Sequence, residues 1–472
     1  MMLDLDSLTI REMVDCQKKG LLKSITIIEH YLRRYDQFNP TLNAIVEQAP
    51  LSTLLASAEN ADIDIQQGDV QGELHGIPIT VKDAMHAQGF RPSRGVKELY
   101  GAKSDKDATV LSRLKKQGAI PLGLTNVPEM CMSFDTHNPL YGRTLNPHNV
   151  SFSCGGSSGG EASAIASGMS PGGLASDACG SVRIPAHFNG ICGFKLTQGR
   201  VPLTGQFPRD RSGLFHLTSS FGVMGRYVDD VDLLASFIHG GDGQDPDTVT
   251  VPYQDYRQCD IQGLKVGVWR GEDTGVTLCP DIDKALSKVE AILARNVSSV
   301  EPIIPPLISE ACDVIWKLFV LGGDGGRGWQ ALYQQMSKSE FTPEIAAILE
   351  QSKNLEMTAD EIKGAMITRD TFRHQLSLMF NQVDVLISPV YPDVAFKNGT
   401  SMERIGNYAF VFPFSLSGSP AIVIPVSRCS DTGMPIGIQI VGKHWSEHQI
   451  LAVASALEAS LQYPLFEQKP LI

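Results

Sequence analysis

The chain has 472 residues, of which 42% are hydrophobic and 19% charged, a composition typical of a soluble globular protein with a substantial core. Its formal net charge of −12 argues against a nucleic-acid partner. The nine cysteines lack the spacing of a metal site, which favours reduced thiols in a cytosolic protein. The N-terminus does not resemble a signal peptide, and no apolar run is long enough to span a membrane. We therefore expect a cytoplasmic protein without a membrane partner.

Hydrophobic periodicity predicts alternating helices and strands in the first part of the chain. Ser24 is a candidate N-cap for the second of two N-terminal helices. We expect, in order, a helix pair in 7–35, a strand at 42–47, a helix at 52–61, a polar connection at 63–72, a strand at 76–83, a helix at 109–117 and a strand at 119–124.

The second half continues the alternation, which favours an α/β fold. Residues 199–222 have turn-forming composition and are expected to form a loop. The glycines of 322–328 formally fit a dinucleotide-binding motif, but a helix precedes them, so we expect a turn that lines a channel or a lid hinge. The remaining predictions are helices at 228–239, 280–295, 311–321 and 447–461 and strands at 264–269, 297–306, 383–389, 420–425 and 436–441. Without a repeat or linker, we expect a single domain over 1–472.

Two serine-containing turns stand out in the middle of the chain. The first is Gly155-Gly-Ser-Ser-Gly-Gly160, and glycine permits backbone conformations and close ligand approach that a Cβ forbids. A small, apolar, helix-compatible segment follows at 161–169, and the N–H groups at the start of such a helix favour an oxyanion. The second turn is Asp177-Ala-Cys-Gly-Ser-Val-Arg-Ile-Pro185, with Ser181 placed 24 positions after Ser157 (181 − 157).

A serine hydroxyl needs a base before it becomes a useful nucleophile. Residues 155–159 formally fit the G-x-S-x-G nucleophile elbow, which would imply a histidine base. An elbow requires an apolar strand directly before it, but residues 147–154 are polar and turn-like. Lys82 ends an apolar run, and by itself it would be expected to be a solvated lysine at a strand terminus.

Together these motifs resemble the amidase signature family. The serine turns match its signature, and Gly76-Ile-Pro-Ile-Thr-Val-Lys-Asp83 matches its lysine motif. The similarity covers most of the chain, since further matching segments lie at 124–129, 141–147, 199–205 and 433–442. The resemblance implies one α/β domain in which a mixed β-sheet is sandwiched between α-helices, and a reaction without metal or cofactor.

The resemblance also assigns the catalytic groups. Ser181 matches the family's nucleophile, Ser157 its bridging serine and Lys82 its general base. Burial disfavours the charged form of a lysine, so a neutral Lys82 amine would accept a proton relayed through Ser157. The family's pattern further implies a cis peptide bond between Gly156 and Ser157.

The turn before the nucleophile is expected to form the oxyanion hole through the backbone N–H groups of Ala178, Cys179 and Gly180. Cys179 departs from the family, which usually has glycine there, so the acyl pocket is narrower unless the backbone adopts a compatible conformation. Cys179 is also a rival nucleophile. Cys131, Met132 and Phe134 fit either core packing or a substrate pocket, since methionine adapts to varied ligands, and the resemblance favours the substrate pocket.

The sequence thus predicts an amidase that hydrolyses a small or medium linear carboxamide through an acyl-Ser181 intermediate. Within the family, the alternative is the amide-hydrolysing component of a glutamyl-tRNA amidotransferase, which supplies ammonia from glutamine to a partner. The segment Met130-Cys-Met-Ser-Phe-Asp135 does not resemble that subfamily. A serine esterase with a histidine base and a catalytically silent scaffold also stay open, although the intact triad opposes the scaffold. A homodimer is compatible with the sequence. The sequence itself identifies neither the oligomeric state nor the substrate.

Overall fold

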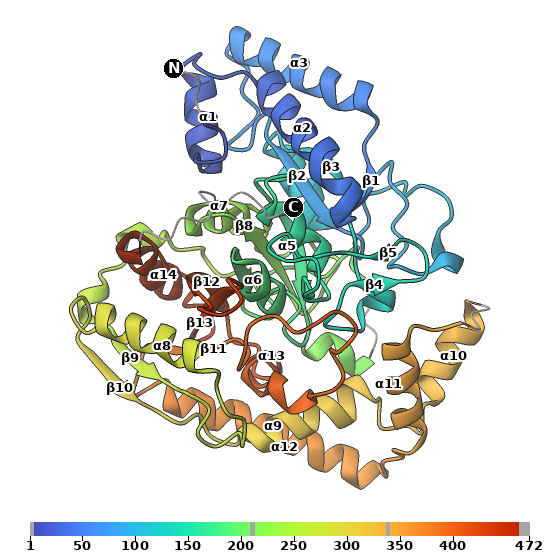
Figure 1. The fold of residues 1–472 in the computed structure, drawn as a ribbon, viewed down its shortest axis with the longest axis vertical. Helices are drawn as coiled ribbons and strands as arrows, with labels where there is room; N and C mark the ends of the chain where they lie inside the picture. Colours follow the sequence, from blue (N-terminus) through green and yellow to red (C-terminus); the bar gives the residue numbers. More distant parts are fainter. Residues whose placement is uncertain (1–3, 208–212, 337–339, 462–472) are drawn as a thin grey trace.

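The computed structural model describes residues 4–207, 213–336 and 340–461. Its centre is an eleven-stranded mixed sheet in the order β1-β3-β2-β6-β8-β7-β12-β13-β11-β9-β10, with helices packed on both faces (Figure 1). A two-stranded sheet joins β4 (His137–Asn138) to β5 (Gly142–Arg143). The strands of the large sheet are β1 (Ile45–Gln48), β2 (Pro78–Lys82), β3 (Ile120–Thr125), β6 (Gly172–Asp177), β7 (Cys192–Lys195), β8 (Ser220–Gly225), β9 (Lys265–Val268), β10 (Ser299–Pro302), β11 (Val385–Pro389), β12 (Ala421–Arg428) and β13 (Pro435–Gly442).

Helices cover the sheet along its whole length (Figure 1). Because they lie on both faces, the central strands are buried on both sides, and all five residues of β2 and all six of β6 are buried. The α-helices are α1 (Ile10–Lys18), α2 (Ser24–Leu42), α3 (Leu51–Gln67), α4 (Thr109–Lys116), α5 (Gly159–Ala166), α6 (Arg183–Asn189), α7 (Val228–Ile238), α8 (Pro280–Leu293), α9 (Ile308–Val314), α10 (Arg327–Gln335), α11 (Pro343–Lys353), α12 (Ala359–Met379), α13 (Phe412–Leu416) and α14 (Glu447–Leu461).

The ends of two neighbouring parallel strands position the serine turns. Strand β2 runs parallel to β6, with Thr80 paired to Gly173 and Val81 to Leu174. Their carboxyl ends therefore lie at the same edge of the sheet, where functional groups of α/β proteins gather. Lys82 ends β2, and Asp177 ends β6.

Helix α5 follows the first serine turn and is buried at every residue. Only small side chains allow this depth, since a Cβ on Gly160 would lie 2.3 Å from Asn126 N. The helix packs against β2, β3 and β6, so the first serine turn is held close to the strands that end at the site.

Most of the predicted elements are present, and three details differ from the prediction. Helix α3 continues to Gln67, through part of the expected polar connection, and the carboxylate of its Asp62 accepts backbone N–H groups at the start of α2. Strand β8 occupies part of the expected loop 199–222 and pairs with β6 and β7. Ser24 is the first residue of α2, whose N-cap is Lys23.

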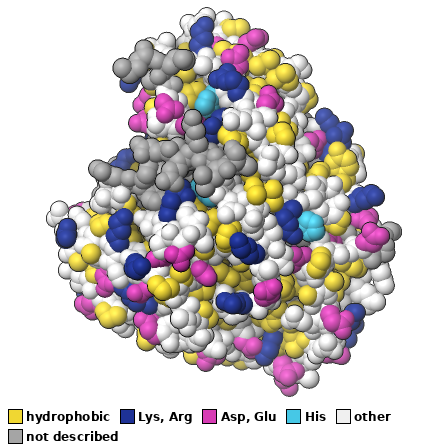
Figure 2. Space-filling model, viewed as in Figure 1, with side chains coloured by type: hydrophobic (Ala, Val, Ile, Leu, Met, Phe, Trp, Pro, Cys, Tyr) yellow, Lys and Arg dark blue, Asp and Glu magenta, His cyan; other side chains and the backbone are white. Residues whose placement is uncertain are grey.

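The face of the molecule that is viewed in Figure 1 carries acidic and basic side chains close to one another over its described surface (Figure 2). None of the helices in the described ranges is long and apolar enough to cross a membrane.

Candidate active site

Lys82 is almost completely buried, with 1% of its surface exposed. Its Nζ lies 2.8 Å from Ser157 Oγ, 3.1 Å from Ser176 Oγ and 3.2 Å from the carbonyl oxygen of Ser176. These two serines supply all the hydrogen-bond partners of Nζ within the described part of the chain. Taken alone, the sequence predicted a solvated lysine here. In the structure, hydroxyl and carbonyl oxygens surround the Lys82 amine, and none of its hydrogen-bond partners in the described chain is a carboxylate.

Burial lowers the pKa of Lys82 from its ordinary value, because desolvation disfavours the ammonium form. Negative charge on Asp177 or Glu161 acts in the opposite direction and does not outweigh burial. The amine form is therefore favoured at a lower pH than it is for a solvated lysine. In that form the nitrogen has a lone pair free to accept a proton.

The loop that carries Ser157 is shaped by glycines and by a cis peptide bond between Gly156 and Ser157, as predicted. A Cβ on Gly156 would lie 2.5 Å from the Ser133 carbonyl oxygen, so only glycine fits against that segment. Ser157 is 2% exposed, and its hydroxyl meets Lys82 on one side and a cavity on the other.

The turn that carries Ser181 is fixed by Asp177. Asp177 Oδ1 accepts the N–H of Gly180 at 2.7 Å, and Oδ2 accepts the N–H of Val182 at 3.1 Å. Both oxygens also accept hydrogen bonds from the fully buried Arg183. Burial alone would raise the pKa of Asp177, but the charge and hydrogen bonds of Arg183 outweigh it and lower that pKa well below its usual range. An ionised Asp177 therefore organises this turn.

The two serine turns are joined directly, since the N–H of Ser158 donates to the carbonyl oxygen of Ser181 at 3.2 Å. No hydrogen bond among the described residues uses the Ser181 hydroxyl. Of the predicted oxyanion donors, the N–H groups of Ala178 and Cys179 make no hydrogen bond within the same ranges, and neither does that of Ser181. The N–H of Gly180 is engaged by Asp177.

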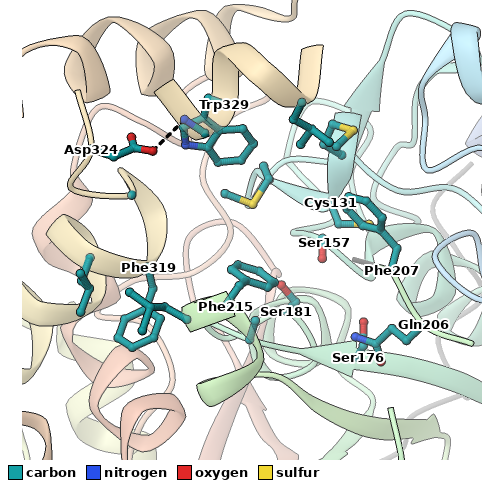
Figure 3. Close-up of a pocket in the computed structure, with 18 residues that line it drawn as sticks. Cys131, Ser157, Ser176, Ser181, Gln206, Phe207, Phe215, Phe319, Asp324 and Trp329 are labelled. Carbon is teal, nitrogen blue, oxygen red and sulfur yellow. Dashed lines mark hydrogen bonds between the residues drawn. The ribbon is translucent and has the colours of Figure 1, made fainter. Parts of the chain in front are cut away.

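A cavity of about 440 Å³ opens in front of both serines (Figure 3). Ser157 and Ser181 lie near one end, while Asp324 and Trp329 lie at the other (Figure 3). Most of the wall is apolar, and the large apolar lining residues are Met130, Met132, Phe207, Leu214, Phe215, Leu318, Phe319, Trp329 and Leu332. Such a wall favours a substrate with an apolar group beside its amide.

The predicted pocket residues all lie beside Ser181. Cys131 and Met132 line the large cavity, and Phe134 lines an adjoining cavity of about 50 Å³ that also reaches Cys179. Phe134 stacks on Tyr408 with ring centroids 3.8 Å apart. Sequence analysis missed the opposite wall, formed by residues such as Phe215 and Trp329, because it comes from segments distant in the chain.

Two rival nucleophile arrangements lose support. Burial raises the pKa of the Cys179 thiol to about 12, so a thiolate is disfavoured there. The residues before Ser157 form turns and isolated bridges, without the strand that a nucleophile elbow requires. The described lining residues of the two cavities beside Ser181 include no histidine.

The family model for amidases matches residues 26–451 of the chain. The chain belongs to the amidase signature family. Amide hydrolysis is the chemistry that this membership supports, and the motif positions that led to the family in the sequence are those that the structure brings together at Lys82, Ser157 and Ser181.

Individual relatives in the amidase signature family differ in activity. A component of the glutamyl-tRNA(Gln) amidotransferase of Halothermothrix orenii is 30% identical, with 97% of this chain and 98% of the relative covered. Fatty-acid amide hydrolase 2 of Homo sapiens is 31% identical, with coverages of 93% and 86%. A bacterial aryl acylamidase structure superposes with a TM-score of 0.86 at 22% identity over 98% of both chains, a likeness that shows the shared fold.

Proposed function

We propose that this protein is an amidase that hydrolyses a linear carboxamide carrying an apolar group, through an acyl-Ser181 intermediate. The observation that carries the proposal is the buried Lys82 amine, 2.8 Å from Ser157 Oγ, behind a cavity that both Ser157 and Ser181 line. The predominantly apolar wall supports an acyl or amine group of medium size that is not charged.

In the proposed reaction, Ser181 Oγ forms a bond to the carbonyl carbon while its proton passes to Ser157 Oγ. Ser157 in turn passes its own proton to the neutral Lys82 amine. The C–N bond then breaks as the proton returns through Ser157 to the leaving nitrogen, which departs as ammonia or an amine. Water attacks the acyl-Ser181 carbonyl by the same relay and releases the carboxylic acid.

The oxyanion of the tetrahedral intermediate would lie at the turn 178–181. Ala178 and Cys179 remain the proposed donors, and the free N–H of Ser181 joins them. Gly180, the third predicted donor, would have to share its N–H with Asp177, to which it already donates. We therefore assign Gly180 the role of shaping the turn.

A second candidate is favoured by the amidotransferase relative, which matches this chain over nearly its full length. In that case glutamine would be the ammonia source and a partner protein the acceptor. The apolar cavity wall supports an independent amidase over this alternative. A cytoplasmic location and a homodimer remain predictions from the sequence.

Release of ammonia or amine from a panel of amides separates the two candidates. The panel should pair aryl and alkyl carboxamides with glutamine, and the purified chain should be assayed alone and after affinity capture of co-purifying proteins. Turnover of apolar amides by the chain alone supports the proposal. The proposal would be overturned if glutamine were the one amide of the panel that is hydrolysed, and if its hydrolysis required a captured partner.

A further inference from the structure

Glu161 is a fully buried glutamate in the first turn of α5, four positions after Ser157. A glutamate at this position of a helix commonly bonds back to the N-cap N–H. Here the N–H of Ser158, the N-cap residue, donates to Ser181 instead. The Glu161 carboxyl reaches in the other direction and contacts the hydroxyls of Thr80 on β2 and Thr125 on β3.

These contacts continue into a chain of hydroxyl groups. Glu161 Oε1 contacts Thr80 Oγ1, which lies 2.9 Å from Ser170 Oγ. Ser170 Oγ lies 2.9 Å from the carbonyl oxygen of Gly172. At the other carboxyl oxygen, Thr125 Oγ1 lies 2.9 Å from Glu161 Oε2 and 3.4 Å from the carbonyl oxygen of Val81, so we assign its hydrogen to the nearer Oε2.

The hydrogens in this chain can be counted. Four contacts link Gly172, Ser170, Thr80, Glu161 and Thr125, but the three hydroxyls supply only three hydrogens. A carbonyl only accepts, so the Ser170 hydrogen goes to Gly172 and the Thr80 hydrogen to Ser170. The contact between Thr80 and Glu161 then lacks a hydrogen unless the carboxyl group carries one. A neutral Glu161 satisfies all four contacts.

We propose that Glu161 is a positioning residue, held as a neutral carboxylic acid up to neutral pH, that ties the helix behind Ser157 to the strand of Lys82 without placing a negative charge beside the amine. The inference concerns the same site and rests on the proposed role of Lys82 as the base. The carboxyl is closely packed, since a Cβ on Gly173 would lie 2.3 Å from Oε1, so only glycine fits there.

The protonation state of Glu161 affects the pKa of Lys82. Burial raises the pKa of Glu161 to about 7, against the opposing effects of its hydrogen-bonding contacts with the two threonines and of the charge of Lys82. Lys82 is the charged group within the described chain whose field acts on this carboxyl. An ionised Glu161 would raise the pKa of Lys82 and weaken the supply of neutral amine, whereas the acid form leaves that supply intact.

Infrared difference spectroscopy of the full chain tests the protonation state without using activity. The wild type minus Glu161→Gln should contain the carbonyl-stretching band of a protonated carboxylic acid at neutral pH. The variant is needed for assignment, because burial also raises the pKa of Glu458 to about 7. Glu447→Gln is the matched control, since Glu447 is 2% exposed and ion-paired with Arg200 at 2.6 Å, so its removal should take away no such band.

Absence of this band from the wild type, or its persistence in Glu161→Gln, would overturn the proposal. Should Glu161→Gln fail to fold, Thr125→Val gives the assignment, because losing the hydrogen bond to Oε2 shifts the band to higher frequency. An unshifted band would then count against Glu161. The spectra decide the point even where no amide is turned over, so this inference and the proposed function fail separately.

Kinetics below pH 7, where the proposal keeps Glu161 protonated, give a second readout. The Glu161→Gln amide can donate to Thr80 and accept from Thr125, so kcat/KM in that range should match the wild type. Were Glu161 ionised there, its removal would lower the pKa of Lys82 and raise kcat/KM by up to about tenfold. Such a rise would contradict the proposal.

Discussion

The Lys82 amine meets the Ser157 hydroxyl at 2.8 Å although the two residues lie 75 positions apart in the chain. Strand β2 ends at Lys82, and α5 begins directly after the turn of Ser157, so the packing of this helix on the sheet sets their separation. The contact joins a buried base to a hydroxyl that opens into the cavity of Ser181. The proposed chemistry depends on this junction.

Activity should rise with pH through the lowered pKa of Lys82, because the base is the neutral amine. Activity is lost as pH falls below that pKa and the amine takes up a proton. The folded state also binds fewer protons than the unfolded state between the lowered pKa and 10.5, so the Lys82 contribution to the free energy of unfolding grows with pH in that window. A kcat/KM profile on an uncharged amide checks the prediction, and a rise confined to the region of 10.5 contradicts it.

Gly180→Ala should disrupt the oxyanion turn. Gly180 has φ +114°, and an added Cβ would lie 2.8 Å from Val411 Cγ2. We expect kcat to fall by about 10²–10³-fold, the cost typical of a lost oxyanion contact, while circular dichroism stays native. Gly263→Ala is the control, because nothing lies within 4 Å of a Cβ there. Equal kcat in the two variants would refute the assigned role of the turn.

Cys179→Gly should widen the acyl pocket, because the half-buried thiol lines the 50 Å³ cavity beside Ser181. The kcat/KM for bulkier acyl groups should rise about tenfold or more relative to small ones, in line with the value of one methylene-sized group in a pocket. Cys259→Gly, at a thiol that lines neither cavity beside Ser181, should leave the ratio unchanged. The ratio is measured on a homologous series of amides, and a constant ratio in both variants means that Cys179 does not limit substrate size.

Asp177→Asn should destabilise the fold, because it leaves Arg183 buried without its charged partner. The free energy of unfolding should fall by about 3–5 kcal/mol, measured by urea denaturation. The wild-type contribution is present above the ordinary carboxyl pKa of 3.8 and is lost as pH falls toward the lowered pKa. Asp313→Asn, at an exposed pair with Lys317, should change stability by less than about 1 kcal/mol, and an equal loss in both variants would contradict this account.

The sequence predicted local features of the site well because each is encoded within a few residues. The glycines around Ser157 specify a tight turn, and the apolar run ending at Lys82 specifies a buried strand. The position of Gly156–Ser157 in the family pattern predicted the cis bond that the structure contains.

Features that depend on the order of strands were out of reach. Strand β8 has two glycines among six residues and resembles a loop until β6 and β7 pair with it. The far wall of the cavity comes from residues such as Phe215 and Trp329, which only the folded chain brings to Ser181. In the sequence, Glu161 stands out as a single acidic residue among small ones. Its role could not be predicted from this, because its hydroxyl partners come from other elements of the fold.

Labelling with a fluorophosphonate, followed by mass spectrometry of the modified peptide, tests the central claim most directly. Such a probe reacts only with a serine that its surroundings activate. We predict a label on Ser181 in the wild type that is lost in Lys82→Ala, while Lys443→Ala, at a partly exposed lysine paired with Asp384, keeps the label. A label on Ser157, or one on Ser181 that survives Lys82→Ala, would contradict the assignment of nucleophile and base.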